Sequence, residues 1–244
     1  MLPIDEPPLD AELIGRRHSA LLARLRAAAE AAGRDPDAFR VVAVTKGFPI
    51  EVVLAAHRAG LGSFGENRVQ EAIPKVAALP AAEWHLVGRL QANKARPAAR
   101  TFAVIHSIDS LDLLRRVDRV AAEESLDPGL VLQVNVSGEP TKAGFPLGWF
   151  TDQARRPAEL VAALGDLDAA RVVGLMTIGP EGAPDEQARS VFARLRRLRD
   201  ALEQAAGRPL PMLSMGMTAD ADAAVAEGAT LVRVGTAIFG PRRA

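Results

Sequence analysis

The sequence predicts a closed (β/α)8 barrel of parallel strands, and three observations lead to this fold class. Short apolar runs alternate with helical patterns along the 244-residue chain, giving eight strand candidates. These runs are apolar throughout, as expected for strands that are covered on both faces. Strict alternation over a chain of this length is typical of a parallel sheet, and eight units favour closure into a barrel. A doubly wound open sheet is the structural alternative.

The elements follow one another without a break after an irregular lead-in at residues 1–8. An extra N-terminal helix is predicted from Leu9 to about Ala32, because Ile14, Leu21 and Leu25 recur at helical spacing and Gly33 ends the pattern. The strand candidates are residues 41–45, 63–64, 84–87, 104–107, 130–136, 172–176, 213–215 and 231–234. The helical patterns between them are residues 50–59, 67–79, 91–99, 111–124, 151–164, 185–206 and 219–227. No linker divides the chain, so residues 1–244 are predicted to form a single domain.

The composition excludes several classes of protein. The chain has no Cys, which excludes a disulfide scaffold, a thiolate metal site and a cysteine nucleophile. Lys+Arg and Asp+Glu both total 30, so the sequence gives no indication of a nucleic-acid binder. The four His residues show no metal-ligand spacing, and we expect no metal site. Because no membrane span or targeting segment is recognisable, we expect a cytoplasmic protein.

Lys46 is the first candidate functional residue, because it stands where the first predicted strand ends. Only four of the 30 basic residues are Lys, so each of them is unusual in this chain. Lys46 shares its in/out parity with Val42 and Val44. If that parity faces the barrel interior, partial desolvation favours the neutral amine that a Schiff base with an aldehyde requires. The alternative is a lysine that simply reaches solvent.

The last two predicted strands end in small and hydroxyl residues, which suggests a phosphate site. Ser214 lies in the seventh strand candidate, and Gly235 and Thr236 follow the eighth. Small residues before a helix let backbone N–H groups approach an anion, and barrels commonly hold phosphate after these two strands. Ordinary helix capping is the alternative reading of the same residues.

Arg233 lies inside an otherwise apolar strand, where an unpaired charge is costly. Its partner is expected to be either a structural carboxylate or a polar atom of a ligand. A lysine amine, a phosphate pocket and an inward arginine together suit pyridoxal 5′-phosphate (PLP), whose aldehyde, phosphate and ring nitrogen each need such a partner.

The chain as a whole resembles the pyridoxal phosphate homeostasis protein family, which is related to the barrel domain of alanine racemase. The matching segments run in order from the first strand to the last: VVAVTKGFP (41–49), FGENRVQE (64–71), WHLVGRLQANK (84–94), HSIDS (106–110), QVNVSGEPTKAGF (133–145), GLMTIG (174–179), LSMGMTAD (213–220) and VRVGTAIFG (232–240). Gly47 and Arg68 depart from residues common in the family, but neither occupies a lysine, arginine or phosphate position.

The resemblance implies a role for each candidate residue. It implies that Lys46 carries PLP as a Schiff base and that Arg233 faces the pyridine nitrogen. It implies that the phosphate is held by Ser214, Gly235 and Thr236. Three further residues fall in family motifs near the cofactor: Asn67, His85 and Met176. Lys142, in the loop after the fifth strand, could reach the cofactor or solvent, and the sequence does not decide between them.

Gly60-Leu61-Gly62-Ser63-Phe64-Gly65 is a literal G-x-G-x-x-G, but it does not predict a dinucleotide site. That fingerprint needs a strand before it and a helix opening within it. Here a helix is predicted before it and a strand within it.

The sequence favours a cofactor carrier over an enzyme. Racemisation on PLP needs proton transfer on both faces, and the related racemases use a lysine and a tyrosine from a second domain. This chain has no Tyr, and we expect no second domain. We therefore predict a monomeric protein of PLP homeostasis that contacts PLP-dependent apoenzymes transiently and binds neither nucleic acid nor membrane. The alternatives are an amino-acid racemase of unknown substrate and a structural barrel with an inert Lys46.

Overall fold

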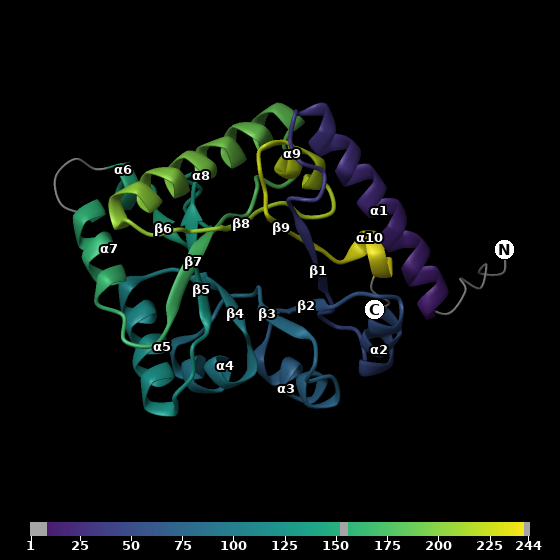
Figure 1. The fold of residues 1–244 in the computed structure, drawn as a ribbon, viewed down its shortest axis with the longest axis horizontal. Helices are drawn as coiled ribbons and strands as arrows, with labels where there is room; N and C mark the ends of the chain where they lie inside the picture. Colours follow the sequence, from purple (N-terminus) through teal and green to yellow (C-terminus); the bar gives the residue numbers. More distant parts are fainter. Residues whose placement is uncertain (1–8, 152–155, 242–244) are drawn as a thin grey trace.

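The computed structural model describes residues 9–151 and 156–241 and shows parallel strands surrounded by helices (Figure 1). The predicted lead-in at residues 1–8 lies outside the described residues. Eight strands form the barrel, in the spatial order β4-β3-β2-β1-β9-β8-β7-β5, and pairing of β4 with β5 closes it. The strands are β1 (Arg40–Val44), β2 (Ser63–Glu66), β3 (Glu83–Leu86), β4 (Val104–Ile108), β5 (Gly129–Asn135), β7 (Arg171–Met176), β8 (Met212–Ser214) and β9 (Leu231–Val234). The predicted closed barrel is confirmed, and the open sheet is excluded.

The helices cover the outside of the barrel, and an extra one precedes the first strand as predicted (Figure 1). Asp10 caps this N-terminal helix by accepting a hydrogen bond from the backbone of Leu13. The helices are α1 (Ala11–Ala31), α2 (Ile50–Arg58), α3 (Val69–Ala78), the short 3-10 helix η1 (Ala92–Lys94), α4 (Ala95–Thr101), α5 (Leu111–Glu124), α6 (Gly148–Thr151), α7 (Arg156–Gly165), α8 (Asp185–Ala206), α9 (Ala221–Ala226) and α10 (Thr236–Phe239).

Three short elements differ from the sequence prediction. A two-residue strand, β6 (Phe145–Pro146), pairs with β5 outside the closed ring. The predicted helix 91–99 is divided into η1 and α4, because Pro97 fits only in the first turn of an α-helix. The predicted helix 151–164 corresponds to α6 and α7 on either side of residues 152–155, which are outside the described residues. Elements of two to four residues are too short to carry a periodic signal.

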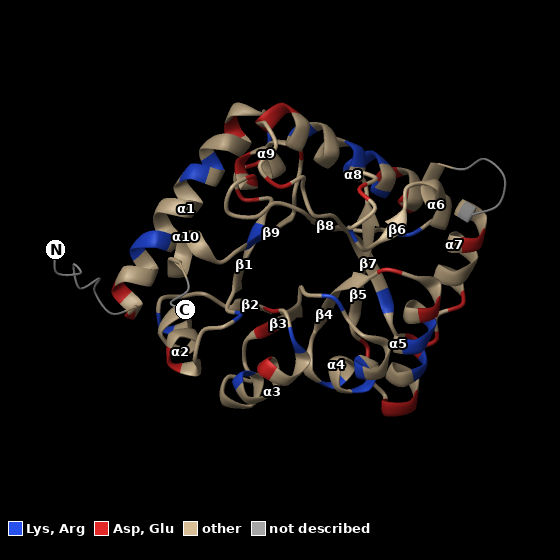
Figure 2. Ribbon diagram, turned by 180° about the vertical axis from the view of Figure 1, so that it is seen from behind, with Lys and Arg blue, Asp and Glu red and all other residues tan. Residues whose placement is uncertain are grey.

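The core has two parts that the barrel wall separates. Most buried apolar side chains lie between the strands and the helices, where Phe64 packs on Trp84 with ring centroids 5.4 Å apart. A second, small cluster consists of Val104, Val131 and Met176, from β4, β5 and β7. Figure 2 shows acidic and basic residues interspersed on the outer helices, together with a basic segment on β9.

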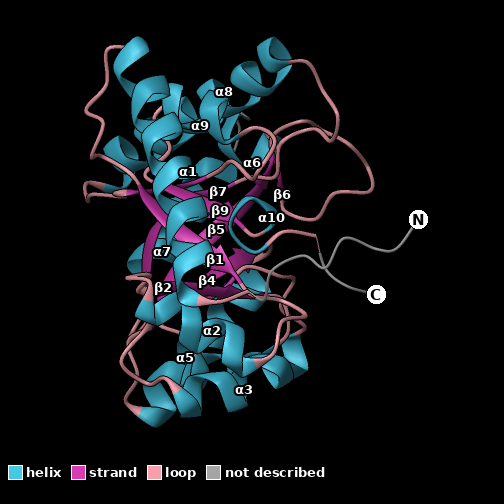
Figure 3. Ribbon diagram, turned by 90° about the vertical axis from the view of Figure 1, so that its right-hand side faces the viewer, coloured by secondary structure: helices cyan, strands magenta, loops and turns pink. Residues whose placement is uncertain are grey.

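The strands all run in one direction, so their carboxyl ends meet on one side of the barrel. Seen from the side, α10 and β6, which follow β9 and β5, lie on this side together with α6 (Figure 3). Functional groups of such barrels gather at this face. Within the described residues, no helix has the length and apolar character needed to cross a membrane.

Candidate functional site

Lys46 follows directly on the end of β1, and the backbone around it is well fixed. The N–H of Thr45 donates to the Gly65 carbonyl of β2 at 2.9 Å, and the N–H of Phe48 donates to the Thr45 carbonyl at 3.1 Å. Gly47 has φ +75°, a left-handed conformation that glycine adopts at little cost. The lysine is partly buried at the mouth of the barrel. The chain therefore turns sharply immediately after Lys46.

A cluster of three charged side chains lies against this turn, and we call it the charge cluster: Glu66, Glu71 and Lys75. Lys75 Nζ donates to Glu66 Oε1 at 2.6 Å and to Glu71 Oε1 at 3.3 Å. It also donates to the Thr45 carbonyl at 3.0 Å, while Glu71 accepts from the Gly47 N–H. Side-chain exposure is 0% for Glu66, 6% for Lys75 and 29% for Glu71. The charge cluster thus joins β1, β2 and α3 next to Lys46.

Burial dominates the electrostatics of Glu66. It raises the pKa of this carboxyl, although hydrogen bonds from Lys75 and Thr45 act in the opposite direction. Thr45 Oγ1 donates to Glu66 Oε1 at 2.6 Å, whereas the buried Glu66 Oε2 has no hydrogen-bond partner among the described residues. A buried acid needs such partners, so Lys75 is what makes a charged Glu66 tolerable here.

A second polar group crosses the barrel interior, and we call it the histidine chain: His85, His106, Ser214 and Arg233. His85 Nδ1 lies 2.9 Å from His106 Nε2, and His106 Nδ1 lies 2.8 Å from Ser214 Oγ. Arg233 donates to Ser214 Oγ at 2.6 Å and to the Thr177 carbonyl at 3.0 Å. All four side chains are buried. They come from β3, β4, β8 and β9.

The donor chemistry gives the histidine chain a direction. A guanidinium only donates, so Ser214 Oγ accepts from Arg233. Since His106 is the other partner of Ser214 Oγ in the described structure, the hydroxyl proton is satisfied by donation to His106 Nδ1. The His106 proton is then on Nε2 and faces His85 Nδ1. Every hydrogen bond therefore points away from Arg233.

A neutral His106 suits this arrangement. Burial, with smaller contributions from His85 and Arg233, holds the pKa of His106 well below its usual value. At the far end, His85 Nε2 lies 3.6 Å from Glu83 Oε2, which is too long for a hydrogen bond but close enough for electrostatic attraction. This contact with His85, together with Arg40 and Ser63, lowers the pKa of Glu83 to about 2.

Arg233 is a buried cation without a carboxylate partner. None of the acids in the described part of the chain lies within salt-bridge distance of its guanidinium, although the charge of Asp220 acts on it from farther away. Desolvation lowers the pKa of Arg233 to about 10, so it stays protonated at neutral pH. Of the two partners considered from the sequence, the structural carboxylate is therefore excluded within the described residues. The hydrogen-bond partners of Arg233 are instead neutral, Ser214 Oγ and the Thr177 carbonyl, and they use two of its five N–H donors.

The predicted phosphate residues lie in two different environments. Gly235 and Thr236 are at the start of α10, accessible from the face where the strands end. A Cβ at Gly235 would come within 3.1 Å of the Val44 carbonyl, so this glycine lets the turn approach β1 two residues before Lys46. Ser214, by contrast, is fully buried, and its hydroxyl is engaged by His106 and Arg233. Its hydroxyl group is thus part of the histidine chain.

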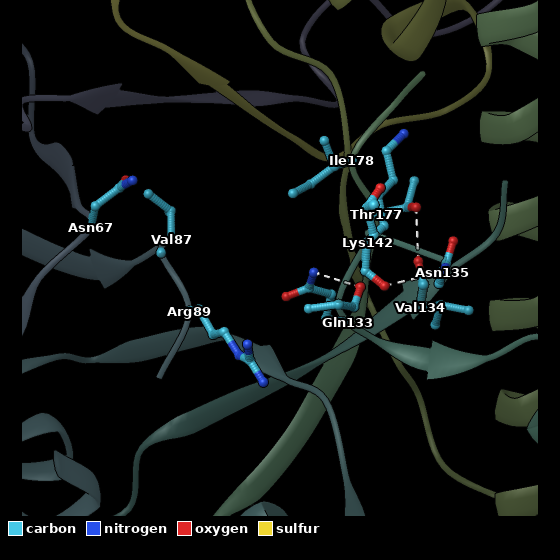
Figure 4. Close-up of a pocket in the computed structure, with 12 residues that line it drawn as sticks. Asn67, Val87, Arg89, Gln133, Val134, Asn135, Lys142, Thr177 and Ile178 are labelled. Carbon is cyan, nitrogen blue, oxygen red and sulfur yellow. Dashed lines mark hydrogen bonds between the residues drawn. The ribbon is translucent and has the colours of Figure 1, made fainter. Parts of the chain in front are cut away.

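A cavity of about 310 Å³ opens at the ends of four barrel strands (Figure 4). Asn67, Val87 and Arg89 lie on one side of it, at the ends of β2 and β3. The other side is formed by the ends of β5 and β7 and by the loop that carries Lys142. Neither Lys46 nor Arg233 lines this cavity, but Thr177, which does, accepts a hydrogen bond from Arg233.

Lys142 is held in place at the cavity. Its Nζ donates to Glu139 Oε1 at 2.7 Å and to the Gly179 carbonyl at 3.1 Å, and 17% of its side chain is exposed. The loop after β5 is thereby fastened to the loop after β7. Gln133 Nε2 adds a hydrogen bond to the Ala143 carbonyl at 2.9 Å.

The structure brings together most of the residues that the sequence predicted. Lys46, Asn67, Gly235 and Thr236 lie at the strand ends, whereas His85, Met176, Ser214 and Arg233 are inside the barrel. Met176 packs in the small apolar cluster with Val104 and Val131. His85 is separated from Arg233 by His106 and Ser214, so its connection to that cation is indirect.

Sequence reasoning assigned no role to four residues of these networks: Glu66, Glu71, Lys75 and His106. His106 is buried and hydrogen-bonded to Ser214, a link that nothing in its own segment indicated. Lys75 carried a usable signal, because it is one of four lysines and stands four residues after Glu71 on a helix. Nothing in the neighbouring sequence indicated that Glu71 and Lys75 face Thr45 and Gly47.

The barrel, the lysine at the end of its first strand and the buried arginine in its last define a barrel of the alanine racemase type. The family model for the N-terminal domain of alanine racemase matches residues 17–243. A likeness in fold alone extends to an alanine racemase of Clostridium difficile, at 13% identity and TM-score 0.68 over 91% of this chain and 57% of that one.

Two closer relatives narrow this assignment. A pyridoxal phosphate homeostasis protein of Pseudomonas aeruginosa is 42% identical over 94% of this chain and 96% of its own length. The PLP-bound structure of PipY from Synechococcus elongatus is 39% identical, with TM-score 0.77 over 93% of this chain and all of that one. The chain belongs to the pyridoxal phosphate homeostasis protein family.

Proposed function

We propose that this protein binds PLP covalently through Lys46 and acts in PLP homeostasis as a carrier rather than as an enzyme. The observation that carries the proposal is Arg233, a buried cation that no described carboxylate balances, on the same barrel as a lysine at a strand mouth. The likeness to relatives named for PLP homeostasis, and to PipY with PLP bound, supports it.

The residues present fit the chemical groups of PLP. The Lys46 amine would attack the aldehyde carbon, forming a C=N bond while the aldehyde oxygen leaves as water. Arg233 has N–H groups to donate to the ring nitrogen and no capacity to accept. Gly235 and Thr236 would hold the phosphate at the start of α10, where the backbone passes close to β1. When bound, PLP would supply an aldehyde for amines and an electron sink.

Asn67, His85, Met176 and Ser214 complete the proposed site. Asn67 lines the cavity and is close to where PLP would extend. Ser214 and His85 act on the cofactor through Arg233, with the Ser214 hydroxyl as an additional candidate phosphate ligand. Met176 would shape the apolar interior below the ring.

Two features favour a carrier. A guanidinium beside the ring nitrogen makes PLP a weaker electron sink than a carboxylate would. The chain has no Tyr to serve as a second acid or base. A single domain, a monomeric state, a cytoplasmic location and transient contact with PLP-dependent apoenzymes remain part of this proposal.

The test begins with the absorbance spectrum of the purified protein, followed by borohydride reduction and peptide mapping. We expect a visible band, a pyridoxyl group on Lys46, and loss of both in Lys46→Ala. Lys94→Ala is the matched control and should keep both. Labelling elsewhere, or no uptake of added PLP, would contradict the proposal.

A second measurement separates the carrier from the racemase. The loaded protein is incubated with amino acids in deuterium oxide, and exchange of the α-proton is followed by NMR. We expect exchange close to that caused by free PLP, together with transfer of PLP to an apoenzyme. Exchange that requires Lys46 and far exceeds the free-PLP rate would favour the racemase.

A further inference from the structure

The peptide groups on both sides of Lys46 are held by charged side chains of one helix. The Thr45 carbonyl accepts a hydrogen bond from Lys75 Nζ at 3.0 Å, and the Gly47 N–H donates to Glu71 Oε1. Both side chains belong to α3 and are one helical turn apart. Lys46 is therefore the residue between two charge-assisted hydrogen bonds, which are stronger than bonds between neutral groups.

This pair differs from the other ion pairs that join residues four apart on a helix. Arg16–Glu12 and Arg189–Asp185 are exposed and lie on the outer surface. Exposed pairs of this kind contribute little to stability. Lys75 is 5% exposed and makes three contacts, one of them to the backbone of β1. Glu66 completes its coordination, so Lys75 has little freedom to move.

We propose that Lys75 and Glu71 are positioning residues for Lys46. They hold the backbone before and after it, so that its long side chain starts from a fixed Cα and reaches the cofactor aldehyde in a favourable geometry. This inference rests on the proposed function, because it assigns the charge cluster to the reaction of Lys46 with PLP. It is expected physically, because small misplacements of a reacting group reduce reactivity strongly.

The competing explanation is that the charge cluster only fastens α3 to the barrel. The two explanations differ in what they predict for a ligand without an aldehyde. Pyridoxine 5′-phosphate has the ring and the phosphate of PLP but carries an alcohol, so it cannot bond to Lys46. A positioning role affects PLP and spares this analogue, whereas a purely structural role affects both.

The experiment compares Glu71→Ala with the matched control Gln70→Ala, an exposed neighbour on the same helix. Dissociation constants for PLP and for pyridoxine 5′-phosphate are measured by titration on the full chain. We expect Glu71→Ala to weaken PLP binding about tenfold or more, because a charge-assisted bond to Gly47 is lost. Binding of the analogue should change less than about twofold, and Gln70→Ala should change neither.

The conservative variant Glu71→Gln tests whether PLP binding can be restored. Glu71→Gln keeps an oxygen that accepts from the Gly47 N–H, so it should recover most of the PLP affinity. Glu71 is 29% exposed, and we expect its variants to fold. If Glu71→Ala lacks the circular dichroism spectrum of the parent, Glu71→Asp replaces it, because it keeps the charge but withdraws the oxygen from Gly47.

The outcomes separate this inference from the function on which it rests. If the parent protein is not labelled at Lys46, the proposed function itself fails. If the parent is labelled but Glu71→Ala binds PLP as tightly as Gln70→Ala, the positioning role is overturned alone. Equal weakening of PLP and its analogue also overturns it, in favour of the structural explanation.

Discussion

The charge cluster and the histidine chain are both buried polar groups at the barrel, but they are built in opposite ways. In the charge cluster, Lys75 is surrounded by Glu66, Glu71 and the Thr45 carbonyl, so each charge has a partner of opposite sign. In the histidine chain, two histidines and a serine lead to one cation, Arg233, which no described carboxylate balances. The first group contains charges of both signs in direct contact, whereas the second ends in a cation that no described carboxylate balances.

The difference indicates what each group is suited to do. A compensated cluster is rigid and holds neighbouring backbone, which matches its position beside Lys46. A buried cation that lacks a counter-charge is costly for the free protein and becomes favourable only when a ligand supplies acceptors. The comparison can be tested by changing one member of each group.

Lys75→Met should have the largest effect on stability. It removes the only cation of the charge cluster and leaves the buried Glu66 without compensation, at a cost of about 3–5 kcal/mol in free energy of unfolding. Urea denaturation measures the change. Adding Glu66→Gln to this variant should recover part of the loss, because the uncompensated acid becomes neutral. A loss below about 0.5 kcal/mol in the single variant would show that the cluster is not compensated as described.

Ser214→Ala tests the histidine chain. It should lower the free energy of unfolding by about 1–3 kcal/mol, because His106 and Arg233 both lose a hydrogen-bond partner. The matched control is Ser107→Ala. Ser107 is equally buried, but its hydroxyl has no hydrogen-bond partner among the described residues. Its removal should leave the unfolding midpoint in urea nearly unchanged. Equal losses in both variants would mean that the link from Arg233 to His106 contributes nothing.

The free energy of unfolding should decrease at acidic pH, in a range that His106 of the histidine chain sets. The pKa of His106 is held well below 6.5 in the folded state, so the unfolded chain takes up its proton first as the pH falls. Stability is therefore complete above about pH 6.5 and decreases below it, by up to ~1.4 kcal/mol per pH unit from this residue. His18, whose pKa burial also lowers, adds to the same trend.

Urea denaturation at several pH values gives the slope of this decrease. His106→Gln should reduce the slope, and His18→Gln is the control for the second contribution. An unchanged slope in His106→Gln would show that His106 is not held neutral in the folded protein.

Gly47→Ala should have the smallest effect on stability, and it changes a residue that contacts the charge cluster. A side chain at φ +75° costs about 1 kcal/mol, because left-handed backbone strains residues with a Cβ. Gly62→Ala is the control, since Gly62 has no positive φ and a Cβ there would meet open space. Thermal unfolding measures both. A loss in Gly62→Ala as large as in Gly47→Ala would argue against a special conformation after Lys46.

Much of the fold could be predicted because it depends on local patterns. The helices at 111–124 and 185–206 and the last strand at 231–234 were predicted with the observed bounds. Each has a strong apolar period or a short apolar run between turn residues. The strand β6 and the bounds of α6 and α10 were not predicted, because two to four residues carry no period.

The candidate site, like the fold, could be predicted only in part. Lys46 and Arg233 could be selected from the sequence, because a charged residue at or within an apolar strand is conspicuous by itself. The partners of Arg233 could not be predicted, since the guanidinium could have met a carboxylate. Ser214 is 108 residues from His106 in the chain, and only the register of the strands puts their polar atoms 2.8 Å apart.

The sequence by itself therefore determined the order of the strands and helices, the closed barrel, and the two basic residues selected as candidates for the site. Only the tertiary structure decided which polar groups meet: Lys75 of α3 with Glu66 of β2, and Arg233 with Ser214, which in turn meets His106. The physical reason is that periodicity reports which face of an element is buried. The partner that a buried polar group meets there depends on closure and register, which join residues distant in the chain.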